Sequence, residues 1–134
     1  MRLIPVFAAV SLAALASPAF AQTDITPEQI EAATAAIEEF ELSDTLYQNL
    51  WCGSTFLIVE NMLREQGNTA DADSAAPLKD ALFTKAATEA VAAGISEEDF
   101  VAMSEHFRIV AISQTAEGGE ADYTQEECVA AAQA

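Results

Sequence analysis

The two cysteines are the side chains of this sequence best suited to covalent chemistry. Cys52 and Cys128 do not form a C-x-x-C motif, so dithiol redox catalysis is not indicated. In an exported chain, two cysteines indicate one structural disulfide, and we predict a Cys52–Cys128 bridge. Closing so long a loop would stabilise the fold by about 4–5 kcal/mol on the chain-entropy model. The alternatives are two unpaired buried thiols or a bridge between two chains.

His106 is the only histidine, so any imidazole-based acid–base or metal chemistry must pass through it. Its neighbours on the same helical face are apolar: Ala102, Met103, Ile109 and Val110. Glu105 precedes it but points about 100° away around a helix. We therefore expect a structural or surface role for His106, because a metal site would need carboxylates from another helix.

The carboxylates form no recognisable metal or catalytic motif. Asp71 and Asp73 alternate as in a calcium-binding loop, but Ala76 stands where that loop needs glycine and Leu82 where it needs glutamate. With His106 as the only histidine and no partner for it, no serine triad can be assembled. The sequence therefore predicts a protein that is not an enzyme, with no catalytic residue, no cofactor and no metal ligand.

The first 21 residues have the pattern of a secretory signal peptide. Arg2 supplies a positive charge, an apolar run extends from Ile4 to Ala16, and Ala19-Phe20-Ala21 matches a cleavage site. We predict cleavage between Ala21 and Gln22, leaving residues 22–134 as a single domain in the periplasm or outside the cell. An uncleaved anchor is disfavoured because a spanning helix needs about 20 apolar residues, and we expect no membrane attachment after cleavage.

The charge of the predicted mature chain is strongly acidic. All 22 acidic residues follow the signal segment but only four of the five basic residues do, namely Arg64, Lys79, Lys85 and Arg108. Such a surface repels nucleic acid phosphates and anionic lipid headgroups, which excludes both as partners. The bias fits a solvated export product, and it also fits binding to a cationic protein.

The segment from Ser43 to Gln66 is the element that the others must cover. It contains the only tryptophan, one of the cysteines and the densest run of large apolar side chains. Cys52, Phe56, Val59 and Leu63 form one row at helical spacing, and Leu46, Leu50, Gly53 and Leu57 form a second row beside it. An apolar face this wide predicts the central helix of a small bundle. We predict that this helix ends at Gly67.

Helix-start signals recur along the chain. Thr26 precedes Pro27 and is followed by Gln29 at the capping-box position, so the first helix begins at Pro27. It is close enough to Ser43, the next predicted cap, to bend into the central helix. Ser96 caps a helix that fades by Ala116, and Thr124 with Glu127 precedes a short alanine-rich helix carrying Cys128.

Between Gly67 and Pro77 the sequence is small and polar, and we predict a loop there, followed by a helix from Pro77 to Ala93. The residues expected to face inward from that helix are Leu78, Leu82, Phe83, Ala86, Ala87, Ala90 and Val91. No strand pattern is present. The sequence thus predicts an all-α fold: an antiparallel bundle of about four helices plus a short C-terminal helix, held by one disulfide.

These features favour a non-enzymatic binding or structural role in the periplasm. One alternative is a pH-responsive chaperone, because protonation of 22 carboxylates would remove the negative charge and could expose apolar helix faces. In outline the chain is similar to small periplasmic acid-stress chaperones, with which it shares export, helical character and a single disulfide. The other alternative is an inhibitor or sequestering partner of a cationic protein, whose approach the charge would steer.

Overall fold

The computed structural model describes residues 25–116 and 118–134. This part of the chain is an all-α bundle without strands, formed by α3 (Pro27–Glu39), α4 (Asp44–Glu65), α5 (Thr69–Ala92), α6 (Glu97–Thr115) and α7 (Gln125–Gln133). The predicted fold class is therefore confirmed. The predicted signal peptide, with its cleavage site between Ala21 and Gln22, lies outside the described residues.

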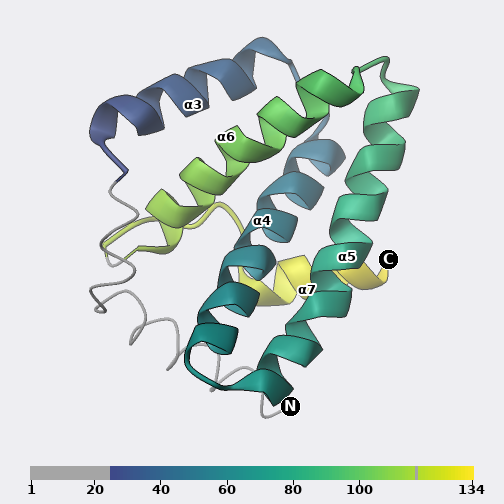
Figure 1. The fold of residues 1–134 in the computed structure, drawn as a ribbon. Coiled ribbons are helices and arrows are strands. Elements are labelled where there is room, and N and C mark those ends of the chain that lie inside the picture. Colours follow the sequence, from purple (N-terminus) through teal and green to yellow (C-terminus); the bar gives the residue numbers. More distant parts are fainter. Residues whose placement is uncertain (1–24, 117) are drawn as a thin grey trace.

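Helix α4 is the central element. Its six consecutive residues from Asn49 to Ser54 are all buried, so this stretch is covered on every side. Helices α5, α6 and α7 pack directly against α4, whereas α3 packs mainly along α6 (Figure 1). The short helix α7 lies crosswise against α4 and α5, as expected for an element tied to the bundle by a disulfide.

The four helix starts predicted from a capping residue are confirmed by side-chain hydrogen bonds. The hydroxyls of Thr26, Ser43, Ser96 and Thr124 each accept a bond from the main-chain N–H three residues later. Gln29 and Glu127 complete the two predicted capping boxes by accepting from the main-chain N–H of their caps. These bonds satisfy donors that a helix leaves free at its N-terminus, which is why so local a signal fixes where each helix begins.

Helix α3 stops before α4 and does not bend into it. Glu41 adopts a left-handed conformation with φ of 49°, and its N–H donates to the carbonyl of Glu38. Gly67 ends α4 as predicted: its φ is 78°, and the N–H of Asn68 donates to Leu63 O at 2.8 Å. That pair of features is a Schellman ending, in which the left-handed residue turns the chain back onto the helix.

The loop predicted between Gly67 and Pro77 is wrong, because α5 already begins at Thr69 and runs through Pro77. A proline inside a helix removes one hydrogen bond and is locally unfavourable. Tertiary packing offsets this cost, since Ala72 and Ala75 are fully buried against Leu63 of α4. The small residues that suggested a loop are the ones that let α5 approach α4 closely.

Most inward-facing positions of α5 are confirmed, but Val91 is not. Leu82, Ala86 and Ala90 are buried at intervals of four residues, whereas the side chain of Val91 is 76% exposed. Val91 follows Ala90 and so points about 100° away from the buried face. Gly53 of α4 faces Phe83 of α5. A Cβ atom added to Gly53 would lie 3.3 Å from the Phe83 ring, so glycine at this position permits the close contact between α4 and α5.

Candidate functional site

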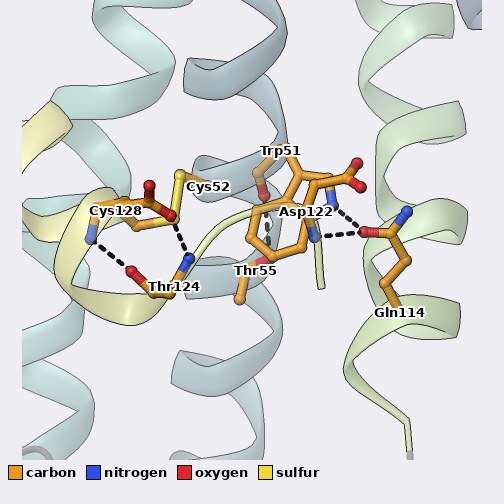
Figure 2. The surroundings of a disulfide bond; sticks show 8 residues. Trp51, Cys52, Thr55, Gln114, Asp122, Thr124 and Cys128 are labelled. Carbon is orange, nitrogen blue, oxygen red and sulfur yellow. Dashed lines mark hydrogen bonds between the residues drawn. A yellow bond between two sulfur atoms is a disulfide. The ribbon is translucent and has the colours of Figure 1, made fainter. Parts of the chain in front are cut away.

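The predicted disulfide is present between Cys52 and Cys128, with a Cα–Cα distance of 5.3 Å. Both cysteines are buried, at 0% and 2% exposure, so the bridge is sheltered from solvent. It fastens α7 to the central helix (Figure 2). Its burial fits a structural crosslink and leaves no accessible sulfur for redox chemistry.

A hydrogen-bonded junction lies beside the disulfide. Gln114 Oε1 accepts one bond from the indole Nε1 of Trp51 at 2.8 Å and another from the main-chain N–H of Asp122 at 3.0 Å (Figure 2). A single side chain of α6 thus joins the core of α4 to the segment that leads into α7. This junction positions Asp122 and the residue that follows it, Tyr123.

Next to this junction is a surface cavity of about 430 Å³. We call it the tyrosine–aspartate pocket, and it is lined by Leu42, Asp44, Tyr47, Asp122 and Tyr123. The phenol of Tyr47 donates a hydrogen bond of 2.6 Å to Asp122 Oδ2, which joins α4 to a segment 75 residues later. The pocket therefore exists only because the segment before α7 folds back onto the start of α4.

Both tyrosine rings of the pocket are held by aromatic residues of the core. Tyr47 meets Phe107 edge to face, with ring centres 4.9 Å apart, and Tyr123 meets Trp51 in the same way at 5.6 Å. The two tyrosine rings are 6.3 Å apart and tilted by 52° to each other. They form two walls at an angle, supported from behind by Phe107 and Trp51.

The electrostatic environment of the pocket is negative. Burial, together with the hydrogen bond and charge of Asp122, raises the pKa of Tyr47 well above its ordinary value. Burial and the charges of Asp122 and Asp44 raise the pKa of Tyr123. Both phenols therefore stay neutral at physiological pH, and the aspartates carry the charge of the pocket.

The basic side chains of the described part of the chain are engaged elsewhere. Arg64 and Lys79 both contact Glu60, and Arg108 pairs with Glu105. The ammonium of Lys85 donates to the main-chain oxygen of Ala134. None of these four cations lines the tyrosine–aspartate pocket, so its aspartates are not neutralised by a neighbouring lysine or arginine.

Glu60 is the buried carboxylate of the structure, with only 7% of its surface exposed. It accepts hydrogen bonds from Lys79 Nζ at 2.7 Å and from the guanidinium of Arg64 at 2.9 and 3.1 Å, so it links α4 to α5. The bond from Lys79 is the main cause that lowers the pKa of Glu60 below its ordinary value. The sequence analysis did not identify Glu60. The available signal was its position four residues after Phe56, which places a carboxylate on the apolar face of the central helix.

His106 lies partly exposed on α6, and no hydrogen bond to its ring occurs within the described residues. In residues 25–116 and 118–134, no three histidine, cysteine, aspartate or glutamate side chains are grouped so that they could hold a metal ion. None of the helices described has both the length and the apolar character needed to cross a membrane.

The residues of the tyrosine–aspartate pocket were not recognised as a set from the sequence. Asp122 and Tyr123 stand directly before the Thr124 cap, but nothing local indicates that they approach Tyr47. Comparison of the chain with protein-family models, curated proteins and solved structures finds no match.

Proposed function

We propose that this chain is an exported, non-enzymatic binding protein whose partner is a cationic protein. One observation carries the proposal: the four basic side chains of the described residues are engaged within the molecule, while most carboxylates of the same residues remain outside such pairs. Over the described residues, negatively charged side chains therefore far outnumber positively charged ones. The resulting negative field accelerates the approach of a positively charged partner.

The fold suits this role because its charge is carried on a rigid body. The disulfide and the Trp51–Gln114 bond fix the relative positions of α4, α6 and α7. Helices that are already held in place lose little backbone freedom on binding, so more of the electrostatic gain is retained.

Titration calorimetry with synthetic peptides tests the proposal. The oxidised protein, residues 22–134, should bind a peptide of alternating arginine and glycine, should not bind the corresponding glutamate peptide, and should bind more weakly as salt is raised from about 50 to 500 mM, where charges are screened. The control is the same chain reduced and alkylated with iodoacetamide. This treatment keeps the net charge, but the enlarged side chains of Cys52 and Cys128 can neither re-form the disulfide nor fit their buried positions in the bundle. Equal affinity for this control, or no binding by the folded protein, would contradict the proposal.

A second candidate, a chaperone activated by acid, is favoured by the position of Glu60. Where the end of α4 meets the start of α5, the buried apolar cluster is small and consists of Leu63, Ala72 and Ala75. The packing of the two helices there also depends on the ion pairs of Glu60. Protonation of Glu60 would weaken this end. The discriminating measurement is dye binding and suppression of aggregation of a test protein between pH 7 and pH 2: activity only in acid supports the chaperone, and a bundle that stays closed opposes it.

A further inference from the structure

We infer that the tyrosine–aspartate pocket is the site that receives an arginine side chain of the cationic partner. This inference rests on the proposed function and adds to it a defined point of contact. The pocket contains the only two tyrosines of the whole chain, and they come from segments 76 positions apart in the sequence. Its volume of about 430 Å³ is in the range of small-ligand pockets.

The chemistry of the walls selects an organic cation. The two tyrosine rings, 6.3 Å apart and tilted by 52°, offer aromatic faces to a positive group, and Leu42 offers an apolar contact for the stem that carries it. Asp44 and Asp122 supply the opposite charge. An anion would be repelled, and a metal ion, which holds its hydration shell tightly and has no apolar stem, would gain less from the aromatic rings and nothing from Leu42.

Arginine fits these walls better than lysine does. Its guanidinium is planar, so it can lie against an aromatic ring while its N–H groups donate to a carboxylate in the same plane. Lysine carries a compact, strongly hydrated charge and makes only the ionic contact well. Since none of the four basic side chains of the described residues lines the pocket, an incoming guanidinium meets no competing cation there, and the Tyr47 hydroxyl occupies only one oxygen of Asp122, Oδ2.

The pocket is also held in place before any ligand arrives. Tyr47 is fixed by its bond to Asp122 and its contact with Phe107. Tyr123 is fixed by Trp51, and the main-chain N–H of Asp122 by Gln114. Binding therefore requires little ordering of the receptor, which favours measurable affinity for a single side chain.

Fluorine NMR of protein labelled with 3-fluorotyrosine tests the inference, because its two signals both report on the pocket. The probe is N-acetyl-L-arginine amide, and N-acetyl-L-citrulline amide is its neutral match. We expect the arginine compound to shift both signals in a saturable manner and the citrulline compound to leave them unchanged. Equal shifts with the two compounds would overturn the inference.

The variant for this test is Asp44→Asn with Asp122→Asn, which keeps side-chain size and leaves an acceptor for the Tyr47 hydroxyl. We expect binding of the arginine compound and of the arginine–glycine peptide to weaken by about tenfold or more, as loss of ionic contacts to a guanidinium implies. The control is Glu31→Gln with Glu65→Gln, which removes the same charge from two exposed positions on α3 and α4. It should reduce binding far less.

The outcomes separate this inference from the proposed function. If the folded protein binds the peptide and the two aspartate substitutions weaken it no more than the two glutamate substitutions do, the pocket is not the site, although the proposed function stands. If the peptide does not bind at all, the proposed function fails, and the response to the arginine compound alone decides the pocket. If the arginine compound binds but the peptide binds equally well to the aspartate variant, the pocket accepts free guanidinium compounds and the inference about the partner is wrong.

Discussion

The indole Nε1 of Trp51 donates a hydrogen bond of 2.8 Å to Gln114 Oε1, joining the buried centre of α4 to the last turn of α6. The same oxygen accepts from Asp122 N at 3.0 Å. One amide group therefore determines how two helices and the segment before α7 meet. The Gln114 side chain also supports one wall of the tyrosine–aspartate pocket, because Tyr123, which lines that wall, directly follows Asp122.

Substitution of Gln114 by alanine should destabilise the bundle by about 1–3 kcal/mol, since it leaves the buried Trp51 donor without a partner. Urea unfolding followed by tryptophan fluorescence measures both the loss and the change around the indole. The control is Gln133→Ala, at an exposed position of α7, which should change stability by less than about 0.5 kcal/mol. Similar values for the two variants would show that the Trp51–Gln114 bond contributes little.

Replacement of both cysteines by serine should lower the free energy of unfolding by about 4–5 kcal/mol, because the bridge closes a loop of 76 residues. Helix α7 has only nine residues and should lose protection first. Urea unfolding gives the stability, and hydrogen exchange of the α7 amides gives the local effect. The wild-type protein in reductant should behave in the same way. Unchanged protection of α7 in the serine variant would show that packing alone holds it.

Glu60 should make stability depend on acid. Since its pKa is lower in the folded protein than in the unfolded chain, its ion pairs stabilise the fold at neutral pH, and this contribution is lost as the pH falls through the folded-state pKa. Glu60→Gln should cost about 1–3 kcal/mol at pH 7. The difference from wild type should shrink between about pH 5 and pH 3.

The matched control for Glu60 is Glu105→Gln, which breaks the exposed pair with Arg108 and should cost about 0–1 kcal/mol at pH 7. Urea unfolding of the three proteins at each pH provides the comparison. A Glu60→Gln variant as stable as wild type at pH 7 would show that burial of the carboxylate offsets its ion pairs.

Gly53 should resist enlargement because a Cβ atom there would already lie 3.3 Å from the Phe83 ring. Gly53→Leu should destabilise the protein by about 1–3 kcal/mol through overpacking between α4 and α5. The double variant Gly53→Leu with Phe83→Ala should recover part of that loss, since the smaller side chain leaves room. Thermal unfolding of both single variants and the double variant measures the coupling. Strictly additive effects would mean that Phe83 is not the obstacle.

The sequence by itself determined the fold class and most helix boundaries. Thr26, Ser43, Ser96 and Thr124 cap the helices that follow them, and Gly67 ends α4, because a cap depends on atoms only a few residues away. The Cys52–Cys128 pairing also followed from the sequence, since two cysteines allow one bridge within a chain. Such signals are local or combinatorial, and they hold without knowledge of the packing.

The tertiary structure decided the features that depend on contacts between distant parts of the chain. The first turns of α5, before Pro77, are helical because Ala72 and Ala75 pack against Leu63, a contact that does not exist until α5 folds back on α4. The buried carboxylate of Glu60 is paired with Lys79, which comes from the next helix. The tyrosine–aspartate pocket brings together Tyr47 and Asp122, 75 residues apart. Each of these depends on long-range contacts, whose partners a helical period or a cap does not specify.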